Sequence, residues 1–171
     1  MPIRPIVKFP DERLRLISKD IEDPAAVQDL VRDMTETMYA SDGAGLAAIQ
    51  VGEPLNLFII EATVAGADES APPIVFINPQ ILELSEERYM ADEGCLSFPG
   101  IFVPIERSLR ARVRATDLEG KAFEMKGEGL LARAMQHESD HLNGKLLADY
   151  VGRIKRQLIT RKLAKARDAE E

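Results

Sequence analysis

The sequence predicts an α+β fold in which short, mainly antiparallel β-sheets surround a central helix over residues 128–143, with another helix at the C-terminus. Apolar residues recur at the 3.6-residue helical spacing between residues 130 and 142, and Asn143-Gly144 follows as a stop signal. Residues 109–116 alternate apolar and basic side chains, and a Gly-containing turn connects them to a second strand-like run. This second pattern is typical of an antiparallel hairpin.

The first part of the chain is expected to form an arm, a helix and a tight connection. Residues 1–20 mix short apolar pieces with charged residues, which indicates an arm lying on the body of the protein. Asp23-Pro24 is a helix-start signal, and the apolar stripe after it predicts a helix to about Ala40. Small residues dominate positions 43–52 and predict a tight connection that a backbone or a ligand can approach closely.

The middle of the chain is expected to contribute strands. Residues 55–62 form an apolar run typical of a buried strand, and the Gly- and Pro-containing residues 64–73 predict a mobile loop. Asn78-Pro79 interrupts the next apolar stretch, so this stretch is predicted as two short strands. The strands expected after the loop are residues 74–77, 81–84, 109–116 and 121–126.

An amphipathic helix is expected at the end of the chain. Its apolar stripe alternates with many lysines and arginines, and the stripe consists of Ile154, Leu158, Ile159 and Leu163. Such a helix can dock on the body of the protein or contact a polyanion, although a solvated basic face is the commoner arrangement.

Length and composition indicate an ordinary globular protein. The chain has 171 residues, which favours one domain spanning 1–171; 45% of them are hydrophobic and 30% are charged. The net charge of -7 argues against a general DNA- or RNA-binding protein. No apolar run is long enough to cross a bilayer, no secretory signal is visible, and a single cysteine excludes a disulfide framework. These features predict a cytoplasmic protein with no membrane partner.

The two histidines of the chain form an H-E-x-x-H motif, His137-Glu138-Ser139-Asp140-His141. On a helix, His137, Glu138 and His141 fall where apolar core residues are expected, and burying them costs several kcal/mol unless a partner such as a divalent metal compensates. Chance produces this pattern in roughly 1 of 900 arrangements of two histidines, so coincidence is the weaker interpretation. The opposite helix face is predicted to face solvent or to form hydrogen bonds; it carries Arg133, Gln136, Asp140 and Asn143.

Two imidazoles do not complete a metal site, because a catalytic ion usually has three protein ligands and one open position. The chain has no third histidine, which leaves Cys95 or one of many carboxylates. A lone cysteine is often a small buried hydrophobe, but Cys95 follows an acid and a glycine in a turn-rich stretch. The residues alone leave the third ligand open.

Three segments of the chain resemble the motifs of peptide deformylases. They are Gly43-Ala44-Gly45-Leu46-Ala47-Ala48-Ile49-Gln50, Glu93-Gly94-Cys95-Leu96-Ser97 and Gln136-His137-Glu138-Ser139-Asp140-His141. They occur in the family's order, with the cysteine 42 residues before the first histidine, and the resemblance spans essentially the whole chain. It implies a metal-dependent hydrolase, acting in protein biosynthesis, that removes the N-formyl group from the N-terminal methionine of nascent polypeptides and releases formate.

The resemblance also implies roles for individual residues. Cys95, His137 and His141 are the expected ligands of one divalent ion, whose bound water attacks the formyl carbon with Glu138 as general base and acid. The amide of Gln50 and the backbone N–H of Leu96 are expected to stabilise the oxyanion. The backbone positions expected to contact substrate are Ala44, Gly45 and Gly94.

The methionine side chain needs an apolar pocket beside the metal. Leu130 and Ala134 precede His137 by two turns and one turn of the helix, on one row of its surface, and are expected to line this pocket. Arg133 is expected to contribute its aliphatic stem.

The ligand set suits several ions. Zinc, iron(II), cobalt and nickel all accept one thiolate and two imidazoles, and the resemblance points to iron(II) as the native ion, with Zn²⁺, Ni²⁺ or Co²⁺ in a purified sample. The expected partners are N-formylmethionyl peptides, with ribosome contact through the basic C-terminal helix, and the protein is expected to be a monomer.

Two departures from the family pattern concern the substrate cleft. Ala44 is smaller than the branched residue common at this position, and no basic residue follows the cysteine motif between Phe98 and Ile105, where some members have one that contacts the peptide. Two alternatives also remain open from the residues alone. One is a zinc peptidase that cleaves internal peptide bonds, and the other is a structural metal site in a protein that binds ribosomal RNA.

Overall fold

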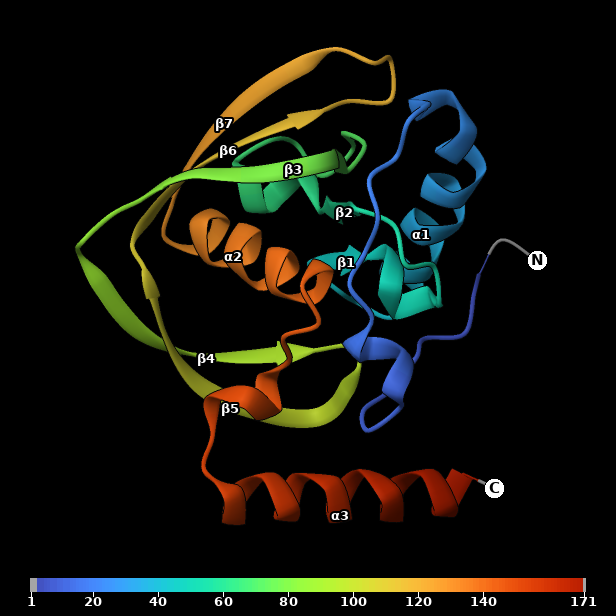
Figure 1. The fold of residues 1–171 in the computed structure, drawn as a ribbon, viewed down its shortest axis with the longest axis vertical. Helices are drawn as coiled ribbons and strands as arrows, with labels where there is room; N and C mark the ends of the chain where they lie inside the picture. Colours follow the sequence, from blue (N-terminus) through green and yellow to red (C-terminus); the bar gives the residue numbers. More distant parts are fainter. Residues whose placement is uncertain (1–2, 171) are drawn as a thin grey trace.

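In the computed structural model, which describes residues 3–170, one helix lies between two β-sheets (Figure 1). This helix is α2 (Leu130–Leu142), close to the predicted range. On one side lies a sheet of order β1-β2-β3-β6-β7, and on the other side lies the hairpin β4–β5. All pairs of neighbouring strands in these sheets are antiparallel. The predicted α+β fold is therefore confirmed.

The bounds of the elements follow the chain. The strands are β1 (Gly45–Ala47), β2 (Leu57–Ile60), β3 (Ile74–Leu84), β4 (Arg88–Cys95), β5 (Phe98–Ser108), β6 (Arg110–Thr116) and β7 (Ala122–Glu128). The other α-helices are α1 (Gln28–Ala40) and α3 (Arg153–Glu170). Short 3₁₀ helices are η1 (Glu12–Arg15), η2 (Pro24–Val27), η3 (Ala48–Val51), η4 (Ala62–Ala65) and η5 (Leu147–Tyr150).

The hairpin β6–β7 confirms the alternation found in the sequence. Its register runs from Arg110 opposite Glu128 to Thr116 opposite Ala122. Ala111 and Val113 are buried against α2 and its neighbours, whereas Arg112 points outward and pairs with glutamates of β3 and β7. The basic residues of this strand therefore form a solvated, ion-paired sheet surface.

The predicted break at Asn78-Pro79 is wrong, because β3 is one continuous strand. Asn78 has a positive φ of 51°, which asparagine tolerates better than most residues, and the pairing with β6 shifts its register between Ile77 and Gln80. The Asn78 side chain accepts a hydrogen bond from the Ile21 N–H and donates one to the Ile21 carbonyl. Asn78 thus lies in a bulge within one continuous strand, and its side chain also fixes the segment around Ile21.

The hairpin β4–β5 was not predicted from the sequence. In β5, buried Ile101, Val103 and Ile105 alternate with exposed Phe102 and Pro104, so the strand has one inner and one outer face. The strand β4 ends at Cys95, which pairs with Phe98 at the tip of the hairpin and contacts His141 of α2.

The described part of the predicted N-terminal arm, residues 3–20, lies on the body, as predicted, while residues 1 and 2 of the predicted arm lie outside the described residues. Its apolar residues Val7, Phe9 and Leu14 are buried. The Val7 N–H donates to the Gln50 carbonyl at 2.7 Å, and the Phe9 N–H donates to the Ser97 carbonyl at 2.9 Å. The arm therefore connects the segment around η3 with the segment that follows β4.

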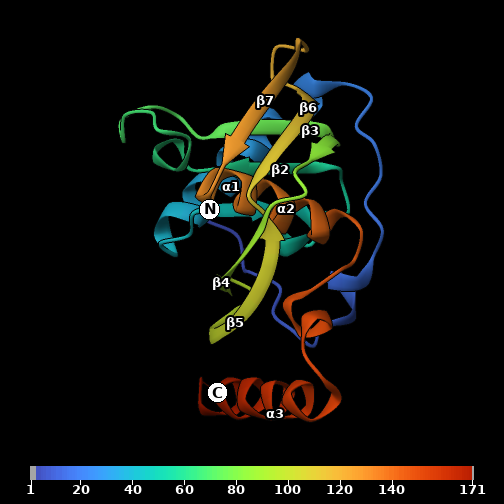
Figure 2. The ribbon, with the colours of Figure 1, turned by 90° about the vertical axis from the view of Figure 1, so that its left-hand side faces the viewer.

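The helix α3 lies beyond β5, at the edge of the molecule (Figure 2). Ile159 and Leu163 are buried against the cluster that contains the inner face of β5, but Ile154 and Leu158 are 76% and 56% exposed. Only half of the predicted apolar stripe is therefore used for docking. No helix among residues 3–170 is both long enough and apolar enough to cross a membrane.

Candidate active site

Cys95, His137 and His141 converge between the hairpin β4–β5 and α2. Their potential ligand atoms all lie within 4.8 Å of one another, and the Cys95 Sγ lies 3.4 Å from the His141 Nε2. The two histidines are one helical turn apart on α2, whereas the cysteine comes from the other layer. The structure therefore brings the lone cysteine to the two imidazoles, where the three residues could hold a metal ion.

The donor set fits a divalent transition metal. One sulfur and two imidazole nitrogens are ligands that zinc and iron(II) accept, and no further histidine, cysteine or carboxylate among residues 3–170 completes a group of four. The Nδ1 of His137 faces a carboxylate, which leaves its Nε2 for an ion. Glu138 Oε1 is buried and has no hydrogen-bond partner among the described residues. A carboxylate oxygen beside the open coordination position of a metal ion is expected to be left unpaired in this way.

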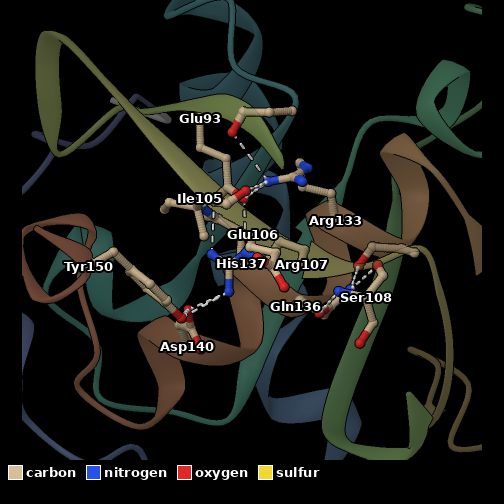
Figure 3. A network of polar contacts seen from close by, with 12 residues as sticks. Glu93, Ile105, Glu106, Arg107, Ser108, Arg133, Gln136, His137, Asp140 and Tyr150 are labelled. Carbon is tan, nitrogen blue, oxygen red and sulfur yellow. Dashed lines mark hydrogen bonds and ion pairs between the residues drawn. The ribbon is translucent and has the colours of Figure 1, made fainter. Parts of the chain in front are cut away.

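Glu93 orients His137 from behind. Its carboxylate Oε1 lies 2.8 Å from the His137 Nδ1 and accepts from the Arg107 Nη2 at 2.9 Å (Figure 3). The other oxygen accepts from the Arg107 Nε at 2.8 Å and the Arg133 Nη1 at 2.5 Å. Burial opposes ionisation of Glu93, but the hydrogen bonds from Arg107 and His137 outweigh it and lower the pKa of Glu93 to about 2.

This polar network continues from Glu93 to the start of the C-terminal segment. The Arg107 Nη1 donates to Asp140 Oδ2 at 2.8 Å and to the Tyr150 hydroxyl at 3.0 Å, and the Tyr150 hydroxyl donates to Asp140 Oδ2 at 2.5 Å. Figure 3 shows these side chains meeting around α2. The network therefore joins β4, β5, α2 and η5 through buried charges.

One face of α2 is more buried than the solvent-facing prediction allows. Arg133 and Gln136 are only 5% and 6% exposed. Gln136 donates to the Ser108 carbonyl at 3.0 Å and accepts from the Ser108 N–H at 3.2 Å, so its amide pairs with β5 as a neighbouring backbone would. The hydrogen-bonding alternative is thus the correct one for these two residues.

Glu138 lies beside the cluster in a buried setting. Its side chain is packed so closely against β1 that a Cβ atom on Gly45 would lie 2.7 Å from Glu138 Oε2. Burial raises the pKa of Glu138 to about 7. A carboxyl group with this pKa can both accept and donate a proton near neutral pH.

Gln50 and Leu96 flank the cysteine. The buried Gln50 amide donates from Nε2 toward the Cys95 Sγ at 3.4 Å and to the Ser97 Oγ at 3.1 Å, while its Oε1 accepts from the Ala47 N–H at 2.9 Å. The amide orientation is therefore held so that the nitrogen faces the cluster. Leu96 follows the cysteine and packs on Gly43.

A cavity of about 530 Å³ opens above the cluster. Eleven of the site residues expected from the sequence line it: Ala44, Gly45, Gln50, Gly94, Cys95, Leu96, Leu130, Arg133, Ala134, His137 and Glu138. His141 is not among the lining residues; it is 2% exposed, with its Nε2 turned to the cysteine. Leu130 is 62% exposed at the first residue of α2, and the guanidinium of Arg133 turns to Glu93 and Tyr89.

Sequence reasoning missed several residues of this site. Glu93 belongs to a recognised motif, but its partners Arg107 and Arg133 are 14 and 40 residues away along the chain. Phe102 and Asp42 line the cavity as well. The alternation of residues 98–108 is the one signal that could have revealed this strand and the outward position of Phe102.

Comparisons with known proteins give a consistent result. The family model described as polypeptide deformylase matches residues 3–157. A peptide deformylase of Bartonella tribocorum is 48% identical over 166 residues, which cover 96% of this chain and 93% of the relative, and one of Bartonella henselae is 49% identical with the same coverage.

Solved structures agree with these relatives. The crystal structure of a peptide deformylase from Legionella pneumophila has a TM-score of 0.90 and 43% identity, covering 98% of this chain and 97% of that one. A peptide deformylase from Ehrlichia chaffeensis, in complex with actinonin, has a TM-score of 0.90 and 39% identity, covering 97% of this chain and 98% of that one. This chain therefore belongs to the peptide deformylase family, metal-dependent hydrolases that remove the N-formyl group from nascent peptides.

Proposed function

We propose that Cys95, His137 and His141 hold one divalent ion and that the cavity above them receives the formyl-methionyl end of a nascent chain. The convergence of three donor atoms beside a buried acid carries this proposal. The bound ion would act as a Lewis acid that lowers the pKa of a water molecule.

Glu138 is the proton carrier in this proposal. Its carboxylate accepts the proton of the attacking water and passes it to the leaving amine, and its buried position beside the three donor atoms supports this role. As the formyl carbon is attacked, the formyl oxygen gains negative charge. The Gln50 Nε2, which already faces the cysteine, and the Leu96 N–H donate to that oxygen.

The lining of the cavity supports the proposed substrate positions. The methionine side chain packs between Leu130 and Ala134, and the aliphatic stem of Arg133 closes this wall. The peptide backbone passes Ala44, Gly45 and Gly94, which line the cavity.

A formate-release assay tests this function. The protein purified without oxygen is expected to release formate from formyl-Met-Ala, whereas Glu138→Ala loses at least about a hundredfold in kcat. Cys95→Ala is expected to abolish stoichiometric metal binding as well. Full activity of Glu138→Ala, or unchanged metal content in Cys95→Ala, would contradict the proposal.

We further propose iron(II) as the native ion, because a thiolate-containing ligand set is compatible with it and oxygen sensitivity suits a reducing compartment. Elemental analysis of protein prepared anaerobically tests this assignment. A zinc-only preparation with full activity would contradict it.

The proposed setting is the cytoplasm, where one domain acts as a monomer on chains leaving the ribosome. The basic face of α3 and its exposed Ile154 and Leu158 would contact the ribosome. Co-sedimentation with ribosomes tests this contact. Reversing the exposed charges of Lys155, Arg161 and Lys162 should abolish it, and these side chains lie outside the buried row of α3. Light scattering tests whether the protein is a monomer. Cell fractionation tests whether it lies in the cytoplasm.

A further inference from the structure

Phe102 is a large apolar side chain that lies exposed at the rim of the active-site cavity. It is 67% exposed and lines the cavity from β5. Its ring covers Gly94 so closely that a Cβ atom there would lie 2.8 Å from the Phe102 Cε1. Since Gly94 directly precedes Cys95, the ring sits beside the entrance to the cluster.

The position of Phe102 follows from the register of the hairpin. Asp92 pairs with Pro104 and Met90 pairs with Glu106, so these residues share the outer face of β4–β5 with Phe102. Met90 is also exposed, at 61%, but it does not line the cavity. Of these two exposed apolar side chains, only Phe102 can meet a bound peptide.

The charged groups around Phe102 are mostly acidic. The exposed residues Asp42 and Asp92 line the cavity. Arg133 is the only arginine or lysine among the described lining residues, and its buried guanidinium is paired with Glu93; the imidazole of His137, which also lines the cavity, faces the same carboxylate. A peptide leaving the cavity therefore meets an aromatic ring and carboxylates but no free cation in the described lining.

We propose that Phe102 is a specificity-determining residue that favours formyl-methionyl peptides with an apolar side chain at the second or third position and disfavours acidic ones. The inference rests on the proposed function of the cavity. An extended peptide advances about 3.3–3.6 Å per residue, so the residues following methionine reach the ring beside Gly94. An apolar side chain laid on the ring removes apolar surface of both groups from water, whereas an acidic one is repelled by Asp42 and Asp92.

Two series of peptides test the preference of the wild-type enzyme. In formyl-Met-X-Ser and formyl-Met-Ser-X, X is leucine, serine or aspartate. At one of the two positions, kcat/KM is expected to fall from leucine to serine to aspartate, by roughly three- to tenfold at each step. The difference is expected in KM with kcat unchanged, because a contact remote from the formyl group stabilises substrate and transition state equally.

Substitutions of Phe102 assign the preference to this residue. Phe102→Ala should bring the leucine peptide to the level of the serine peptide. Phe102→Arg should raise activity on the aspartate peptide above that on the leucine peptide. Met90→Ala is the matched control, an exposed apolar residue of the same hairpin face outside the cavity, and should retain the wild-type order.

The outcomes separate this inference from the proposed function. If the wild-type enzyme hydrolyses no formyl-methionyl peptide, the proposed function itself fails. If it hydrolyses all of them with equal kcat/KM, or if Phe102→Ala keeps the wild-type order, only the role of Phe102 is overturned. The wild-type series and Phe102→Arg keep the test decisive should the alanine variant fold poorly.

Discussion

The carboxylate of Glu93 lies 2.8 Å from the Nδ1 of His137, and the same carboxylate is held by two buried arginines. This arrangement leaves the His137 Nε2 available for the proposed ion and keeps the ring from turning. The orientation of this proposed ligand is therefore decided largely by Glu93 of β4 and Arg107 of β5.

Replacing Glu93 tests this arrangement. Glu93→Gln leaves the guanidiniums of Arg107 and Arg133 buried with less compensating charge, so we expect a loss of about 3 to 5 kcal/mol in the free energy of unfolding. Affinity for Co²⁺ or Zn²⁺ is expected to fall about 10- to 100-fold, because His137 loses its orienting partner. Urea denaturation and competition with a metal chelator measure the two effects.

Glu106→Gln is the matched control for this change. Glu106 pairs with Arg88 on the exposed side of the same hairpin, where its side chain is 54% exposed. The control should cost less than about 1 kcal/mol and leave metal affinity unchanged. Wild-type metal affinity in Glu93→Gln would show that Glu93 does not position the histidine.

The raised pKa of Glu138 predicts a pH-dependent stability of the metal-free protein. The pKa lies at about 7 in the folded protein, above the ordinary value of 4.5. The contribution of this group to stability is therefore complete below pH 4.5 and is lost as the pH rises through 7. Glu138→Gln cannot ionise, so its advantage over the wild type should grow by about 2 to 3 kcal/mol between pH 5 and pH 8.

Urea denaturation of both metal-free proteins at several pH values measures this difference. A bound cation favours the ionised carboxylate. Adding Zn²⁺ to the wild type should therefore reduce the difference in free energy of unfolding between the wild type and Glu138→Gln at high pH. Parallel pH curves for the two metal-free proteins would refute the buried, raised pKa of Glu138.

Gly45→Ala is expected to displace the proposed proton carrier. The new methyl group would lie 2.7 Å from Glu138 Oε2 and 3.3 Å from the Ile59 carbonyl, and the backbone oxygen cannot move away easily. We expect kcat to fall about 10- to 100-fold through misplacement of the carboxylate. Gly152→Ala is the control, because nothing lies within 4 Å of a Cβ there. Unaltered kcat in Gly45→Ala would mean that Glu138 tolerates displacement.

Tyr150→Phe tests the far end of the polar network. The change removes the hydroxyl that donates to Asp140 and accepts from Arg107, both partly or fully buried. The free energy of unfolding should fall by about 1 to 3 kcal/mol. Tyr39→Phe, at a 43% exposed position, should change it by less than about 0.5 kcal/mol. Thermal or urea unfolding compares the two variants, and equal stabilities would exclude an energetic role for the Tyr150 hydroxyl.

Local patterns were sufficient to predict much of the fold. The helix bearing the two histidines and the hairpin β6–β7 follow from periodicity within a few residues, and both are confirmed. The family motifs also predict that Cys95 lies beside His137 and His141. The structure brings these three side chains together although the cysteine is 42 or more residues before the histidines in the chain.

Features that depend on distant partners were beyond such patterns. Asn78-Pro79 predicts a strand break from local sequence alone. The bulge that the structure has instead is stabilised by two hydrogen bonds between the Asn78 side chain and the backbone of Ile21, 57 residues away. For Arg133 and Gln136 the helix pattern leaves a solvent-facing and a hydrogen-bonding position equally open, because their partners lie on β4 and β5. Glu93 and Arg107, which help to orient His137, belong to the hairpin β4–β5, whose strands are not predicted from local patterns.

The origin of the three proposed ligands in two layers has a consequence for the dynamics of the chain. The thiol belongs to the hairpin β4–β5 and both imidazoles belong to α2, so an ion that binds all three favours the docked arrangement of hairpin and helix. Chelation should therefore accelerate amide hydrogen exchange in β4 and β5 while leaving β6 and β7 almost unaffected. Exchange rates along this hairpin would then report how much of the enzyme in a sample carries its ion.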